Sequence, residues 1–323
     1  MDDALQPFLV RGLTTLQGRS SGMSLADLIG KQNKVGFDLD FDNQKQSIET
    51  NFRDPFPVLD SIASDSSRFA AAAFQTMQSI STKMGERTEI SWCLIQAYYS
   101  AFYAGYSIIR LLGQSCSYLS RSHVTQISIL GAAYGKAPGF RLTASIYQCN
   151  LDSSASSISS KSLRNGPGGA HEAFWNVFGL RIRRINEVIL LGPLGQYEAQ
   201  SVFVKLDSLL HVLCSDGTPL FSWLSAIRNE IQYRHEHGVW LPCDVKKQDR
   251  ERLGRFINQW QRDPMEIDVG APQGGKLGQF VVGCAFIVAL CRSLLTRIVE
   301  RSEPSGRSFA KLGPLAVLRP QAA

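Results

Sequence analysis

The chain has 323 residues, of which 44% are hydrophobic and 19% are charged, and its mean hydropathy of −0.08 lies close to zero. This composition is that of a globular protein and excludes a wholly disordered chain. A chain of this length can bury a large core, as one large domain or two modest ones. No uninterrupted apolar run approaches the roughly 18 residues of a membrane span, and the N-terminus lacks the basic region of a secretory signal. We therefore expect a cytoplasmic protein without a membrane partner.

Charge is unevenly distributed along the chain, and the formal net charge is +6. Residues 1–160 carry 13 basic and 13 acidic side chains, whereas residues 161–323 carry 21 and 15. Such an excess suits a polyanionic partner, although a solvated basic face without a ligand is equally compatible with it. The seven cysteines are scattered and form no C-x-x-C pair, which favours buried thiols in a reducing cytosol over a disulfide framework.

The first 56 residues are expected to form a partly irregular N-terminal appendage. They mix Gly, Ser, Asn, Gln and alternating acidic residues, with short helices expected around residues 4–16 and 24–29. From residue 57 the pattern changes, because apolar residues recur at helical spacing up to residue 80. The main domain, residues 57–303, is therefore expected to begin with a helix.

Residues 88–113, TEISWCLIQAYYSAFYAGYSIIRLLG, give the strongest helical signal in the chain. Thr88 can act as the N-cap of this helix, and Gly113 can end it. The segment is apolar nearly all round, so we expect it to lie centrally in a helical bundle. The most apolar run further along, residues 280–290, likewise indicates a buried helix.

A loop-rich insertion is expected at about residues 114–170. Residues 123–130 and 140–149 are rich in β-branched and aromatic side chains, and a Gly-rich segment separates them, which indicates a hairpin or an irregular segment. The serine-rich stretch at 153–162 is interpreted as a loop, and the RNGPGG stretch that begins at residue 164 as a turn-rich linker.

The second half of the chain is expected to be helical again, starting at His171, which is interpreted as a helix-start residue. Prolines fall between the expected helices, where helix breakers belong. These helices are placed near residues 171–190, 198–214, 219–237, 247–261 and 277–301. Residues 304–323 are interpreted as a C-terminal tail. The fold class predicted from the whole pattern is mostly α.

Three segments resemble familiar functional motifs, but the residues around them do not support the corresponding functions. Residues 18–22 match G-x-S-x-G, but a nucleophile elbow needs a strand before it and a helix after it. Residues 131–136 are one residue short of a phosphate loop and lack the Ser or Thr that holds Mg²⁺. The set His235, His237 and Cys243 lacks the fourth ligand that zinc normally takes. We therefore predict neither a metal nor a cofactor.

The informative segment is residues 222–240, SWLSAIRNEIQYRHEHGVW. Seven residues turn a helix through about 700°, so Arg228 and His235 are expected on one face, two turns apart. Gly238 is expected to cap this helix, which would place His235 near the C-terminal end of the helix dipole. One face would then offer a permanent cation and a group that titrates near neutral pH.

This pair suits the cleavage of RNA. The reaction needs a base for the ribose 2′-hydroxyl proton, an acid for the leaving 5′-oxygen and a cation for the charge that develops on the phosphate. Histidine can serve in either proton-transfer role, and arginine supplies a fixed, bidentate positive charge. The more common interpretation of such a pair is a solvated helix face.

The segment from Arg228 to His235 resembles the R-x(4–6)-H signature of HEPN domains, with Asn229 as the polar residue directly after the arginine. The aromatic helix at 90–113 is similar to a helix that many HEPN domains place early in the bundle. The resemblance covers roughly residues 58–300, with motif support at 90–113 and 222–238. It implies an HEPN-like helical bundle into which residues 114–170 are inserted.

The resemblance also implies a function. Many HEPN proteins are dimeric, metal-independent endoribonucleases of bacterial toxin–antitoxin and anti-phage defence systems. By this resemblance Arg228 would act on the scissile phosphate, His235 would transfer protons, and Asn229 would position the arginine or the substrate. A homodimer would bring two such motifs together, and an antitoxin or another protein of a defence complex would be a partner. The alternative is a non-catalytic module that binds a partner protein or a nucleotide.

Further basic side chains are weaker candidates for RNA binding. Arg181, Arg183 and Arg184 form a small cluster that could bind RNA phosphates, although exposed charge on a helix explains them as well. Arg234 and His237 flank His235 and are added to the candidate RNA-binding residues.

Overall fold

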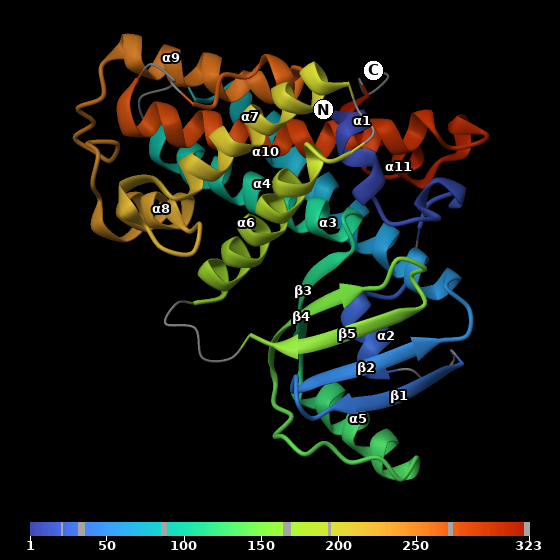
Figure 1. Cartoon of the computed structure of the whole chain (residues 1–323). Helices are drawn as coiled ribbons and strands as arrows, with labels where there is room; N and C mark the ends of the chain where they lie inside the picture. Colours follow the sequence, from blue (N-terminus) through green and yellow to red (C-terminus); the bar gives the residue numbers. More distant parts are fainter. Residues whose placement is uncertain are drawn as a thin grey trace.

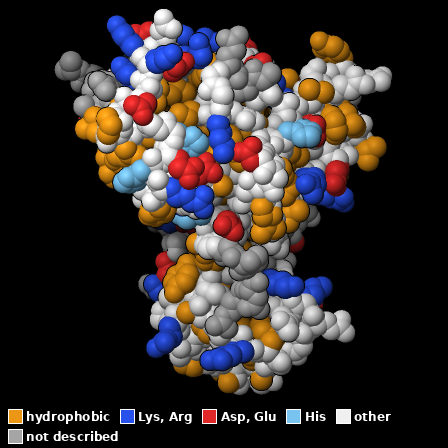
Figure 2. Space-filling view, turned by 90° about the vertical axis from the view of Figure 1, so that its left-hand side faces the viewer, with side chains coloured by type: hydrophobic (Ala, Val, Ile, Leu, Met, Phe, Trp, Pro, Cys, Tyr) orange, Lys and Arg blue, Asp and Glu red, His pale blue; other side chains and the backbone are white. Residues whose placement is uncertain are grey.

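The computed structural model describes residues 1–20, 22–31, 36–84, 89–163, 169–192, 195–270 and 274–319. It is mostly helical, with 62% helix and 11% strand. Two lobes are visible, a helical lobe and a smaller lobe built on one antiparallel sheet, with a narrow waist between them (Figures 1 and 2). The mostly α class predicted from the sequence is confirmed.

The helical lobe contains every long helix that the periodicity predicted, and the observed ends differ from the expected ones by a few residues. Thr88, the expected N-cap of the aromatic helix, lies outside the described residues. The long helices are α3 (Phe56–Ser81), α4 (Ile90–Leu111), α6 (Ala170–Ile189), α7 (Gln196–Leu213), α8 (Trp223–Arg234), α9 (Lys247–Ile257) and α10 (Gly275–Glu300). Two short helices, α1 (Asp2–Leu5) and α11 (Phe309–Leu312), lie near the ends of the chain.

Helix α10 is the core helix of this lobe. Among the described residues it is the one helix that is long and apolar enough to cross a membrane, with a mean hydropathy of 1.9 over its most apolar window. Yet 83% of that window is buried inside the protein, by packing against α4, α9 and other helices. The same length and composition occur in core helices of soluble proteins, and the burial is compatible with a soluble chain. The buried helix expected at residues 280–290 is confirmed.

Helix α4 also lies centrally, because it packs against α3, α10, α8 and α6. Its small residues are fully buried and admit close neighbours, for example Ala97, Ala101 and Ala104. Tyr98 and Phe102 lie four residues apart on one side of the helix, where they contact α6 and α8. This aromatic side of α4 positions the candidate site described below.

The sheet lobe joins two segments that are distant in the sequence. Its strands are β1 (Phe37–Asp42), β2 (Ser47–Phe52), β3 (Gln114–Leu119), β4 (Ser145–Leu151) and β5 (Ser157–Ser162). They follow the order β1-β2-β5-β4-β3, and every neighbouring pair is antiparallel. The N-terminal hairpin thus pairs with the serine-rich strand β5, and residues 36–52 belong to the same lobe as the insertion.

Two helices, α2 (Leu25–Lys31) and α5 (Arg121–Ala133), cover one face of the sheet (Figure 1). Side chains alternate along each strand, and the covered face takes the apolar ones such as Leu39 and Ile158. The helices approach each other closely at Gly30, where a Cβ atom would lie 2.5 Å from the Cβ atom of His123. The opposite face carries polar residues over most of its area.

Several expectations for these segments were wrong. Residues 153–162 are not a loop, because residues 157–162 form β5, and residues 36–52 are a hairpin rather than an irregular segment. The first half of the expected hairpin at 123–149 is helix α5, which begins with a capping box between Ser120 and His123. The insertion is therefore structured rather than loop-rich. Most of the expected turn-rich linker, residues 164–168, lies outside the described residues.

Candidate functional site

Helix α8 carries the Arg228 and His235 of the candidate motif, and it ends earlier than expected. Its last residue is Arg234, and His235 follows in the left-handed conformation, with φ of 55°. The cap expected at Gly238 is therefore supplied by His235 itself, and the Glu236 N–H closes the last turn by donating to the carbonyl of Glu230. Because the backbone turns at His235, the two motif residues do not share a continuous helix face.

Arg228 is buried, with only 5% of its surface exposed, whereas the sequence analysis expected it on an open face. Its Nη1 donates to Oε1 of Gln232 at 3.2 Å. The guanidinium carbon lies 5.1 Å from the ring centre of Tyr98 and 5.8 Å from those of Tyr99 and Tyr233. Such rings stabilise a cation through their negative faces.

The charge of Arg228 has no acidic partner among the residues that the structure describes. Within the described part of the chain, no carboxylate oxygen lies within 4 Å of its guanidinium, and the buried Nε–H has no hydrogen-bond acceptor. A buried cation without a counter-charge is costly, and buried donors are nearly always satisfied. An anion that reached Arg228 would supply both a counter-charge and an acceptor for Nε–H.

A histidine that the motif does not include lies beside Arg228. His171, at the start of α6, places its Nδ1 2.7 Å from the Tyr98 hydroxyl, which also accepts a hydrogen bond from the Trp175 indole at 3.0 Å. The ring of Phe102 lies 4.4 Å from the imidazole. Tyr98, His171, Trp175 and Arg228 thus form one cluster where α4, α6 and α8 meet.

Titration in this cluster is shifted by burial and by the arginine charge. Burial, followed by the Arg228 charge, lowers the pKa of His171 to about 4. Burial raises the pKa of Tyr98, against the effect of hydrogen bonds from Ser225 and Trp175 and of the Arg228 charge. His171 is therefore neutral at pH 7. Since an indole only donates, the Tyr98 proton is available for Nδ1 of the neutral imidazole.

His235 lies outside this cluster, on the surface. It is exposed, and its ring lies 5.2 Å from the ring of Trp240. Trp240 in turn meets Trp92, on the first turn of α4, edge to face at 5.4 Å. Together with Tyr233 and Leu241, which are 68% and 72% exposed, these side chains form an exposed aromatic surface at the end of α8.

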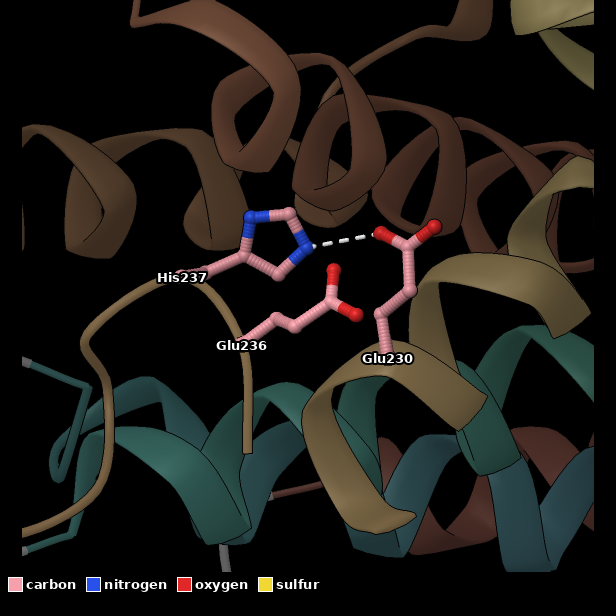
Figure 3. Close-up of side chains that lie close together, drawn as sticks. All are labelled: Glu230, Glu236 and His237. Carbon is pink, nitrogen blue, oxygen red and sulfur yellow. Dashed lines mark hydrogen bonds and ion pairs between the residues drawn. The ribbon is translucent and has the colours of Figure 1, made fainter. Parts of the chain in front are cut away.

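His237 belongs to an ion-pair network rather than to the surface with His235. Figure 3 shows its ring directed at Glu230 from the loop that follows α8, with Glu236 beside the pair. Its Nε2 lies 2.8 Å from Oε2 of Glu230, and Lys276 on α10 lies 3.4 Å from the same oxygen. The face of the helical lobe that Figure 2 presents carries histidine, acidic and basic side chains close together.

One group in the described part of the chain brings His, Cys, Asp or Glu ligand atoms close enough for a metal ion: Glu230, Glu236 and His237, within 4.8 Å of one another. His235 and Cys243, which the sequence offered as companions of His237, are not part of it. The Lys276 ammonium already neutralises the Glu230 oxygen that a metal would use. We therefore interpret this group as a salt-bridge network.

The other candidate RNA-binding residues do not converge on His235. Arg181 donates to the Leu112 carbonyl at the end of α4, and Arg184 pairs with Glu187 at 3.4 Å. Arg183 lies over the ring of Phe221, just before α8 begins, whereas His235 follows its other end, about 18 Å away for twelve residues. Arg234 is exposed and lies 3.9 Å from Glu236, and Asn229 is half-buried.

The sequence analysis found Arg228 but missed its partners. His171, Phe174, Trp175 and Phe178 follow one another at i, i+3, i+4 and i+7, so one side of α6 is aromatic and carries the histidine. This spacing was the feature of the sequence that could have identified His171 as a site residue. No protein-family model, curated protein or solved structure matches the chain. The description of the site therefore rests on the geometry of its residues alone.

Proposed function

We propose that the protein is a metal-independent endoribonuclease of a bacterial toxin or defence system, acting in the cytoplasm. The observation that carries the proposal is Arg228, a buried cation whose Nε–H has no acceptor and whose guanidinium has no carboxylate within 4 Å among the residues that the structure describes. A phosphate of RNA supplies the missing negative charge and the missing acceptor. The type of reaction, metal-independent cleavage of RNA, is taken from the HEPN resemblance. The fold gives no independent support for this type of reaction.

Access to Arg228 requires one local movement. The ring of Tyr233 lies 5.8 Å from the guanidinium and is 68% exposed, so of the three rings around Arg228 described above we take it as the one that moves. A rotation of this side chain opens a path to Arg228 without repacking the core. Stacking of an RNA base on the exposed aromatic surface at Trp92 and Trp240 then holds the strand beside His235.

The proposed roles are those that the HEPN resemblance implies. His235, exposed at the end of α8, transfers the proton, and Arg228 stabilises the charge that develops on the phosphate. His171 is neutral at pH 7 and lies against the same arginine, so it becomes the alternative proton acceptor when its Nδ1 is released from the Tyr98 hydroxyl. Asn229 follows Arg228 directly and positions the arginine or the substrate.

The second function to consider is a non-catalytic module that binds a partner protein. Its support is the exposed aromatic surface, because exposed clusters of large apolar residues mark interaction sites. The same surface also suits a homodimer of the enzyme, in which two His235 side chains face one another across the two-fold axis and serve as acid and base.

Cleavage of RNA in EDTA tests the proposal. The wild-type protein is expected to cut RNA and to leave 2′,3′-cyclic phosphate ends, and His235→Ala to reduce the rate at least about 100-fold. His211→Ala is the matched control, because His211 is an exposed histidine on α7 that pairs with Asp207. Arg228→Met should abolish cleavage, and Arg228→Lys should retain part of it, because the charge remains while the bidentate geometry is lost.

Three results would overturn this assignment. Full activity of His235→Ala together with loss of activity in His171→Gln would move the proton transfer to the α4–α6–α8 cluster. Absolute dependence on Mg²⁺ with 5′-phosphate products would place the active site elsewhere. A wild-type protein that cleaves no RNA, but binds a partner through Trp92 and Leu241, would favour the non-catalytic module.

A further inference from the structure

A cavity of about 670 Å³ lies where the two lobes meet, which is within the range of small-molecule sites. Helices α3 and α4 of the helical lobe form one side of it, and β3, β4 and the start of α2 form the other. Its lining includes Asp65, Arg68, Phe69, Tyr106, Arg110 and Tyr118.

The wall on the helical side is aromatic. The ring centres of Phe69 and Tyr106 lie 5.0 Å apart in a stacked arrangement, and Tyr103 lies 6.3 Å from Phe69. Phe102 meets Tyr106 edge to face at 4.9 Å and extends the wall towards His171. Tyr106 also stacks on Phe174 at 4.1 Å, and the Arg110 guanidinium lies over Phe69, so the parts of these rings that line the cavity form a fixed apolar wall against which a flat ligand can pack.

The wall on the sheet side departs from the polar character of the open face of the sheet. Tyr118 on the edge strand β3 pairs directly with Ile146 on β4, so both side chains point to the open face, and both line the cavity. Further along the same face, the strands carry Glu49, Lys161 and other polar residues. The apolar residues of this face are thus concentrated at the cavity, and Tyr118 is 61% exposed beside it.

The floor is rigid and charged. Arg110 is buried, and it donates to the carbonyl of Tyr106 at 3.0 Å, to the carbonyl of Cys116 at 3.4 Å and to Asp65 at 3.4 Å. It therefore ties α4 to β3 across the junction of the lobes. Asp65 is also buried and accepts hydrogen bonds from the Leu25 amide and from Arg68.

Arg68 at the rim is the accessible cation. Its side chain is 56% exposed, and two of its five N–H groups are used, by Ser64 and Asp65. The two arginines and the one carboxylate of the lining leave a net charge of +1. The cavity therefore combines flat aromatic walls with donors for an anion at its mouth.

We propose that this cavity binds a planar aromatic molecule that carries an anionic group, of the size of a mononucleotide. The ring system lies between Tyr118 and the aromatic wall of α4, and the anion reaches Arg68. The site is separate from Arg228 and His235, and its test uses no RNA, so it stands or fails independently of the ribonuclease assignment.

Calorimetric titration of the full chain tests the proposal with three probes. AMP carries a ring and an anion, adenosine carries the ring alone, and ribose 5-phosphate carries the anion alone. AMP is expected to bind about tenfold more tightly than either fragment, because an ionic hydrogen bond and a stacked base each contribute roughly one factor of ten or more. Indole-3-acetate, an aromatic carboxylate, distinguishes a general aromatic-anion site from one that needs a phosphate.

Two variants locate the binding. Arg68→Gln and Tyr118→Ala are each expected to weaken AMP binding about tenfold. Arg255→Gln and Tyr134→Ala remove an exposed arginine and an exposed tyrosine elsewhere and should leave it unchanged. Circular dichroism on each variant verifies folding, and Tyr118 is exposed enough for its removal to be tolerated. Absence of binding by AMP and by indole-3-acetate would overturn the proposal, as would AMP binding that both cavity variants leave intact.

Discussion

The buried position of His171 makes the stability of the protein sensitive to acid in a defined range. In the folded state its pKa is about 4, against an ordinary 6.5, because of burial and then because of Arg228. Between these two values the unfolded chain binds a proton on this residue and the folded chain does not. The stabilisation is therefore complete above pH 6.5 and is lost progressively as the pH falls towards 4.

The size of this effect follows from the shift. At about 1.4 kcal/mol for each pKa unit, a fall from pH 7.5 to pH 4.5 removes at most about 2.5 kcal/mol of unfolding free energy. Solvent reaches part of the His171 ring and weakens the effect, so we expect a loss of about half this unfolding free energy. Urea unfolding of the wild type and of His171→Gln at both pH values isolates the contribution, because glutamine cannot titrate but can still accept the Tyr98 hydrogen bond.

The reasoning is refuted if the two proteins lose the same stability between pH 7.5 and pH 4.5. A direct measurement is the NMR titration of His171, for which a pKa near 6.5 would contradict the burial. Replacement of Arg228 by methionine should raise the pKa of His171 only part of the way to its ordinary value, because burial is the larger cause.

Two further predictions concern the end of α8. His235→Gly should be more stable than His235→Ala by about 1 kcal/mol in urea unfolding, because only glycine adopts the left-handed conformation there without strain; equal stabilities would show that residue 235 has another conformation in solution. Light scattering should find a dimer for the wild type and a monomer for Leu241→Asp, since Leu241 is 72% exposed on the aromatic surface beside His235. A dimer that survives this substitution would place the interface on another surface.

The long helices were predictable because their apolar residues recur at helical spacing over many turns. The strands could not be predicted from their sequences in the same way. β5 reads SISSKS, and its only large apolar residue is Ile158, so it becomes a strand through pairing with β2 and β4 rather than through its own pattern. Helix α5 is rich in β-branched residues, and the capping box at Ser120 together with the spacing of Val124 and Ile127 outweighs their strand propensity.

Arg228 was predictable from the sequence, but its partners in the cluster and the geometry of the site were not. The motif identified Arg228 and His235, but their exposure depends on where α8 ends and on what covers it. Tyr98 and His171 are 73 residues apart in the chain, and only the packing of α6 against α4 joins them. A one-dimensional spacing argument cannot see such a contact, because it compares residues within one helix.

The pairing of β2 with β5 has a consequence for the order in which the protein is made. Glu49 and Ser159, which are hydrogen-bonded across this pair, are separated by 110 residues. At translation rates of roughly 5–20 residues per second, the N-terminal hairpin waits about 5–20 s for its neighbour. During that time the edge of β2 is open to other chains. We expect the acidic side chains of the hairpin, Asp38, Asp40, Asp42 and Glu49, to repel identical nascent chains and so to disfavour pairing at this edge until β5 emerges from the ribosome.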